Sequence, residues 1–192
     1  MPVAADRICE AMSHLTVYDE DQPATPIVDT DDAARISEEL SGAGIRFERW
    51  NAAHELPDDA DSDTVIDAYR DDIDRLITER GYRTFDVISM HPEHPEKDAF
   101  RNKFLDEHTH SEDEVRFFVR GQGLFVIHVD ERVYAMLCEK DDLISVPANT
   151  RHWFDMGPNP SFTAIRVFNN PEGWVADFTG DDIAKRFPLL EN

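Results

Sequence analysis

The chain has 192 residues, of which 41% are hydrophobic, and this predicts one domain with a sizeable core. It has 41 acidic and 19 basic residues, so its formal net charge is −22. A surface this acidic repels phosphate, which excludes nucleic acid as an expected partner, and like-charge repulsion favours a monomer.

The first hundred residues are expected to form a mixed α/β arm. Strand-like patterns occur at residues 15–18, 45–50 and 85–90, whereas Pro23 and Pro26 indicate a loop. Thr30-Asp31-Asp32 could cap a helix that carries Ala34, Ile36 and Leu40 and ends at Gly42 or Gly44. Apolar residues at three- and four-residue steps predict a helix at residues 63–81, and a short helix is expected at residues 98–105.

From residue 108 the pattern changes to short strand-like runs, at residues 115–120, 123–129, 132–137, 143–146, 152–155 and 162–168. Turn signals such as Gly121-Gln122-Gly123 separate them, which predicts a small antiparallel barrel or double-sheet roll. A short helix is expected at residues 181–187. We therefore expect a single domain over residues 1–192, with an arm (1–100), a core (101–175) and a helical tail (176–192).

The sequence predicts no membrane span, because no stretch approaches roughly 20 apolar residues. The first residues lack the basic start and apolar run of a signal peptide, so we expect a cytoplasmic protein. Cys9 and Cys138 lie far apart and do not indicate a disulfide framework.

Four residues have the spacing of a metal site. His108 and His110 would point the same way on a strand, Glu114 follows four residues later, and His152 lies on a later strand. Three imidazoles and one carboxylate leave two open positions in an octahedral site, and such ligands suit Fe(II), Ni(II), Mn(II) or Co(II). The other histidines lack this spacing and are expected to be surface or hydrogen-bonded side chains: His14, His54, His91, His94 and His128.

The residues around these ligands resemble the two cupin motifs of the acireductone dioxygenases, in the runs 107–110, 113–116, 121–123, 146–148 and 152–154. The resemblance covers about residues 98–175 and implies a cupin β-roll, also called a double-stranded β-helix or jelly roll. It implies one Fe(II) or Ni(II) ion per chain, with acireductone (1,2-dihydroxy-3-keto-5-methylthiopentene) and O₂ as substrates in methionine salvage. The Fe(II) enzyme makes 4-methylthio-2-oxobutanoate and formate, and the Ni(II) enzyme makes 3-methylthiopropanoate, formate and carbon monoxide.

Two arginines are candidates for binding an anionic substrate. Arg116 lies two residues after Glu114 on the same strand face, where a guanidinium could stabilise the substrate dianion. Arg166 lies in an apolar strand and needs a partner, either the anionic oxygens of the substrate or a carboxylate.

The resemblance also places Phe104, Phe154 and Trp174 near the methylthio tail of the substrate, although each could equally be a core residue. Glu107 could orient a histidine or help metal entry, and Asp113 could relay the ligand geometry to nearby backbone. Ordinary solvated carboxylates remain the alternative for both.

Two other functions fit parts of the pattern. A different cupin enzyme, such as an isomerase or a quercetinase-like dioxygenase, would keep the metal but would not need Arg116. A non-enzymatic cupin, such as a ligand sensor or storage protein, usually lacks a ligand or carries a DNA-binding domain. All four ligands are present here and no basic helix pair exists, which favours an enzyme.

Overall fold

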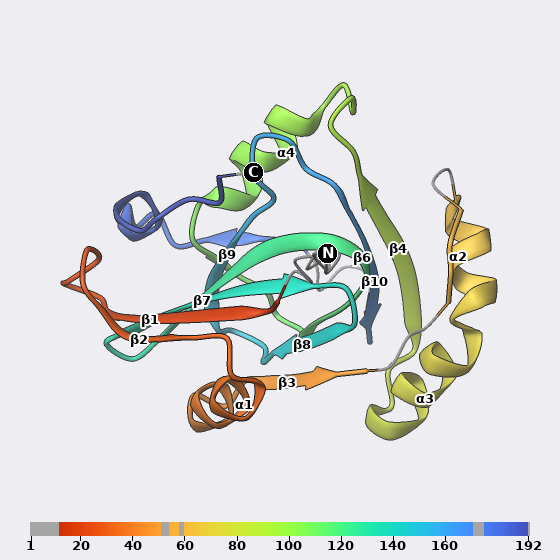
Figure 1. The fold of residues 1–192 in the computed structure, drawn as a ribbon, viewed down its shortest axis with the longest axis horizontal. Helices are drawn as coiled ribbons and strands as arrows, with labels where there is room; N and C mark the ends of the chain where they lie inside the picture. The colour runs from red at the N-terminus through yellow and green to blue at the C-terminus, as the bar shows by residue number, and fades with distance from the viewer. Residues whose placement is uncertain (1–11, 51–53, 58–59, 171–174, 192) are drawn as a thin grey trace, which may run out of the picture.

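A computed structural model describes residues 12–50, 54–57, 60–170 and 175–191 of the chain. Its centre is a long strand, β6 (Glu114–Val129), that belongs to two antiparallel sheets (Figure 1). The first half of β6 pairs with β8 (Asp142–Val146) and β10 (Phe162–Phe168). The second half pairs with β7 (Arg132–Glu139) and β9 (Arg151–Asp155). The predicted double-sheet roll is therefore confirmed.

Strands from the first hundred residues extend both sheets. One sheet has the order β11–β5–β9–β6–β7–β1–β2. Its remaining members are β11 (Asp177–Phe178), β5 (His108–Thr109), β1 (His14–Asp19) and β2 (Pro26–Thr30). In the other sheet, β4 (Thr84–Met90) pairs with β10, and β3 (Arg46–Arg49) pairs with β8.

Two local predictions were wrong, both at turn-forming residues. The loop expected around Pro26 is β2, an edge strand that tolerates proline at its first residue. The turn expected at Gly121-Gln122-Gly123 lies inside β6, where the strand passes from one sheet to the other. Gly121 has φ +66° and its Cβ would lie 1.8 Å from the Ser161 carbonyl oxygen, so the bend requires glycine.

The helices predicted in the first 105 residues are present, with one interruption, whereas the tail differs. They are α1 (Ala33–Gly42), α2 (Ser62–Ala68), α3 (Arg70–Arg80) and α4 (Lys97–Leu105). The helix expected at 63–81 is divided at Tyr69, whose ring packs edge-on against Phe117, 5.7 Å between centroids. Gly81 ends α3 in the left-handed conformation. The tail has a 3₁₀ turn, η2 (Ile183–Arg186), in place of the expected helix.

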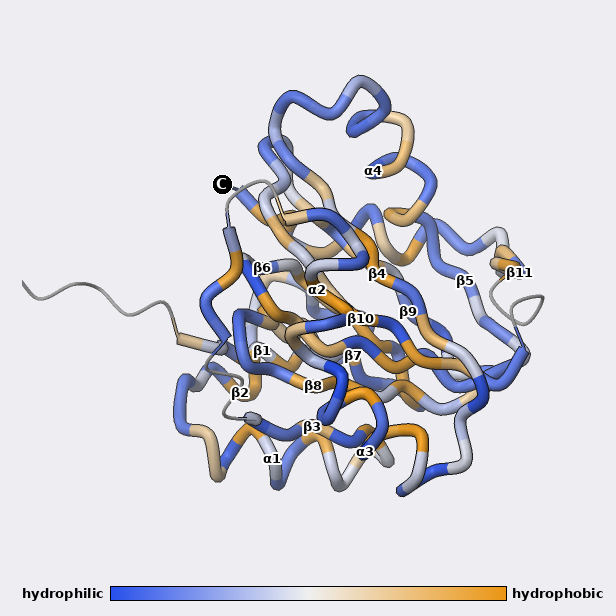
Figure 2. The backbone as a smooth tube through the Cα atoms, turned by 90° about the vertical axis from the view of Figure 1, so that its right-hand side faces the viewer, coloured by the Kyte–Doolittle hydropathy of each residue, from blue (hydrophilic) through white to orange (hydrophobic). Residues whose placement is uncertain are grey.

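The core occupies the inside of the roll and a second layer beneath α2 and α3. Phe118, Phe125 and Phe154 pack inside the roll, while Tyr69 and Ile73 cover the outer face of the second sheet. Figure 2 shows hydrophobic and hydrophilic residues interspersed along the strands. Both faces of β6, β8 and β10 are largely buried, because the roll covers one face and outer elements cover the other. No helix in the described part of the chain has both the length and the apolar character needed to cross a membrane.

Candidate metal centre

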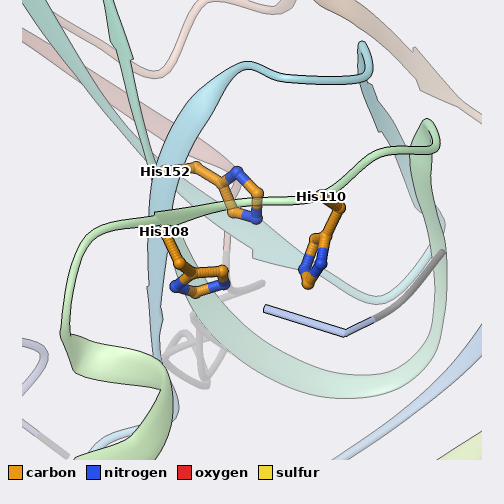
Figure 3. A group of neighbouring side chains, drawn as sticks. All are labelled: His108, His110 and His152. Atoms are coloured by element: carbon orange, nitrogen blue, oxygen red, sulfur yellow. The ribbon is translucent and has the colours of Figure 1, made fainter. Parts of the chain in front are cut away.

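Three histidines from neighbouring segments converge in the roll (Figure 3). His108 on β5 is the cross-strand partner of His152 on β9, and His110 directly follows β5. Each of the three is buried and offers a ring nitrogen, and these nitrogens all lie within 4.8 Å of one another. The alternation expected for His108 and His110 therefore brings both rings to His152.

The backbone fixes the orientation of each ring. The Nδ1 atoms of His108, His110 and His152 lie 2.7, 3.3 and 2.8 Å from the carbonyl oxygens of residues 106, 175 and 150 respectively. A carbonyl oxygen only accepts, so each Nδ1 must carry the hydrogen. Each Nε2 then carries a lone pair, which is the state a metal requires of a histidine.

Glu114 begins β6 beside these rings. Its Oε2 atom lies 2.8 Å from Nε2 of His152 and 3.4 Å from Nε2 of His110. Among the residues that the structure describes, neither Oε2 of Glu114 nor Nε2 of His152 has a hydrogen-bond partner, although both atoms are buried. Two buried lone-pair donors facing each other are unfavourable unless a cation lies between them. The residues therefore fit a metal ion with nitrogen and oxygen ligands.

The protonation states also favour metal binding. Burial lowers the pKa of His108 to about 4, so this ring is neutral near pH 7. Burial alone would raise the pKa of Glu114, but the Arg116 guanidinium and the neighbouring histidines hold it well below its ordinary value. The carboxylate is therefore ionised.

Arg116 lies on the same strand face as Glu114, as predicted. Its Nη2 atom is 2.7 Å from Oε1 of Glu114, and its side chain is buried. The guanidinium carbon lies 4.6 Å from the ring centroid of Phe154 and 5.2 Å from that of Phe125. Aromatic rings and one carboxylate thus hold this cation against the site.

A cavity of about 490 Å³ opens onto the histidines. Its walls include the predicted Phe104, Phe154 and Arg166. Trp174 lies outside the described residues. The sequence analysis missed four other wall residues: Lys103, Val175, Ala176 and Phe178. Phe178 belongs to a two-residue strand opposite His108, and such a short element leaves no periodic pattern in the sequence.

Arg166 forms an ion pair with the carboxylate of Asp86. Its Nε and Nη2 atoms donate to the two oxygens of Asp86 on the neighbouring strand β4, with an Nε–Oδ1 distance of 2.7 Å. Arg166 is also the cross-strand partner of Arg116 and still reaches the cavity wall. Of the two predicted roles, the structure shows the carboxylate pairing, and Asp86 is the residue that the sequence analysis missed.

Glu107 and Asp113 are hydrogen-bonded carboxylates. Oδ1 of Asp113 accepts from the backbone N–H of Ala148, 3.0 Å away, in the turn before β9. Glu107 is buried and contacts His128 and Thr179 at 2.7 Å each.

The other histidines lie in two kinds of environment. His54 and His91 are exposed, whereas His14 and His94 are half-buried, the latter beside Phe100. His128 is buried and hydrogen-bonded.

The fold and the site together define the class of protein. A roll of two sheets with buried histidines converging from neighbouring strands is a cupin fold with a candidate metal centre. The sequence model described as "ARD/ARD' family" matches residues 14–176. The chain therefore belongs to the ARD/ARD' family and is an oxidoreductase.

The similar proteins agree with this placement. The chain is 61% identical over 181 residues to the acireductone dioxygenase of Pseudomonas aeruginosa strain UCBPP-PA14, covering 94% of this chain and 100% of the relative. It is 57% identical over 180 residues to that of Hahella chejuensis, covering 94% and 97%. A solved structure, an acireductone dioxygenase from Bacillus anthracis with a cadmium ion in its active centre, has a TM-score of 0.77 and 30% identity. The match covers 88% of this chain and 99% of that one.

Proposed function

We propose that this enzyme cleaves acireductone with O₂ in methionine salvage. With Fe(II) it would give 4-methylthio-2-oxobutanoate and formate, and with Ni(II) it would give 3-methylthiopropanoate, formate and carbon monoxide. The acireductone dioxygenases at 57–61% identity support this reaction, because they match nearly the whole chain.

The observation that supports the proposal most strongly is that the Nε2 atoms of three buried histidines and Oε2 of Glu114 direct their lone pairs toward one point. We assign His108, His110, Glu114 and His152 as ligands of one Fe(II) or Ni(II) ion per chain. The bound metal would supply Lewis acidity, which lowers the pKa of coordinated hydroxyl groups.

The protein's own side chains would bind and orient the substrate. Arg116 brings a permanent positive charge to the cavity wall, where it would stabilise the anionic oxygens of the enediolate. Arg166 would add a second positive charge there, although Asp86 partly offsets it. The cavity has the volume usual for a small-molecule site.

Aromatic residues would hold the rest of the substrate. Phe104 and Phe154 lie on the cavity wall, where their rings can pack against the sulfur of the methylthio tail. We propose the same contact for Trp174. Asp113 would couple the turn before His152 to the start of β6, and Glu107 would help to orient His108.

The test is an anaerobic mixture of Fe(II)-loaded protein and acireductone, followed by addition of O₂. We expect rapid loss of the ultraviolet absorbance of the enediol, with formate and the 2-oxo acid as products. A repeat with Ni(II) should release carbon monoxide. Loss at the uncatalysed rate by protein that binds the metal would show that this cupin acts on another substrate.

We further propose that the enzyme works as a monomer in the cytoplasm. The net charge of −22 supports this, because identical acidic surfaces repel one another at low salt. Sedimentation at low ionic strength should give the mass of one chain, and a stable oligomer there would contradict the proposal.

A further inference from the structure

A buried histidine outside the ligand set is hydrogen-bonded to two carboxylates. His128 lies near the end of β6, with its Nδ1 atom 2.7 Å from Oε1 of Glu107 and its Nε2 atom 2.8 Å from Oε2 of Glu20. Only 2% of the His128 side chain is exposed. Carboxylate oxygens only accept when ionised, so this arrangement requires a hydrogen on both ring nitrogens. His128 is therefore held as an imidazolium.

The charged groups around His128 favour this state. Burial opposes the charged ring, but Glu107 and Glu20 together raise the pKa of His128 above its ordinary value. Arg151, on the neighbouring strand β9, is the opposing positive charge. Glu20 directly follows β1 and Glu107 directly precedes β5, so the imidazolium connects two elements that are distant in sequence.

Glu107 is held at several atoms beside a predicted metal ligand. Its Oε2 atom accepts from the Thr179 hydroxyl at 2.7 Å, and its carbonyl oxygen accepts from the Thr179 backbone N–H at 3.1 Å. The next residue is His108, whose ring is oriented by the carbonyl of residue 106. Contacts that hold Glu107 in place therefore also restrain the backbone of its two neighbours. One neighbour, His108, carries the ring, and the other, Asp106, carries the carbonyl that orients it.

We propose that His128 is a positioning residue for the metal centre: by holding Glu107 it keeps His108 in the geometry that binds the ion. This inference rests on the proposed ligand set. The ion pair also joins the β1–β2 turn, through Glu20, to the strand that carries His108. His128 itself does not belong to the ligand set.

The test is the affinity for Co(II), measured by competition with a chelator, together with the visible spectrum of the bound ion. His128→Gln keeps one donor and removes the charge, so we expect about tenfold weaker Co(II) binding and an altered spectrum. His14→Gln is the matched control, because His14 on β1 also pairs with a carboxylate, that of Asp29, but its side chain is 42% exposed. It should bind Co(II) as the parent protein does.

A double-mutant cycle identifies the route of the effect. If His128 acts through Glu107, His128→Gln should weaken Co(II) binding little further once Glu107→Gln is present. Circular dichroism of the metal-free variants checks that each is folded. Should His128→Gln fail to fold, Glu20→Gln, whose side chain is 34% exposed, should still weaken binding in the same direction.

The outcomes separate this inference from the proposed function. A parent protein that binds no Co(II) would overturn the metal site itself. Binding by the parent protein with unchanged affinity and spectrum in folded His128→Gln would overturn only the positioning role. If His128→Gln does not fold, unchanged binding by Glu20→Gln would overturn that role in the same way.

Discussion

At the residue scale, the His110 ring lies between Glu114 and the backbone carbonyl of Val175. Its Nε2 atom is 3.4 Å from Glu114, and its Nδ1 atom faces the carbonyl of residue 175. His110→Ala removes one inward lone pair. We expect it to abolish stable binding of Fe(II) and turnover, which metal analysis after gel filtration will measure. Near-full metal content with activity would contradict the ligand assignment.

Arg116 has a different expected effect, since it is not a ligand. Arg116→Ala should retain metal but lower kcat by about 10² or more, because a buried charge at the reacting centre contributes mainly to the transition state. Steady-state kinetics on protein of known metal content will measure this. Arg116→Lys is the control, as it keeps the charge without the planar fork of donors. Unchanged kcat in Arg116→Ala would remove Arg116 from the proposed mechanism.

At the element scale, strand β8 begins with a buried acid, Asp142. Asp142 accepts from Ser13 and from the backbone of Glu139, and burial raises its pKa to about 6 from 3.8. The folded state therefore binds this proton more tightly, so its contribution to stability is greatest below pH 4 and is lost as the pH rises toward 6. Asp142→Asn should remove that loss.

Urea unfolding at several pH values will measure the effect. The stability of Asp142→Asn relative to the parent protein should rise between pH 4 and 6, by on the order of 2–3 kcal/mol. A constant difference across this range would show that Asp142 does not titrate as described.

Much of the fold is predictable because short strand-like runs after residue 108 are separated by turn-forming residues. The two exceptions among the strands share one cause, because turn-forming residues can lie inside a strand when tertiary contacts require them. Gly121 and Gly123 lie within β6, where a side chain would not fit. The backbone of Ser161 crowds Gly121, and the ring of Phe154 crowds Gly123. Spacing predicted that Glu114 and Arg116 share a face, but pairing partners such as Asp86 come from distant strands and leave no local signal.

At the scale of the whole molecule, the predicted ligands lie on strands β5, β6 and β9 and on the segment after β5. A metal ion would therefore join neighbouring strands of the first sheet. Metal that binds only the folded chain stabilises it by about 2.7 kcal/mol at a free concentration of 100 Kd. We expect Tm to rise on adding Ni(II) and to return when a chelator removes it. Calorimetry will measure this, and an unchanged Tm would contradict a site formed only on folding.

The three ring anchors have a consequence for how the sequence can vary. The Nδ1 atom of each histidine contacts a main-chain carbonyl, at residues 106, 150 and 175. In a saturation library, most substitutions at these positions should leave the anchors intact, because every residue type supplies the same carbonyl. Insertions or deletions beside them should be far more damaging, since they would move the carbonyl away from its ring. The metal centre is thus sensitive to the length of these loops and tolerant of their composition.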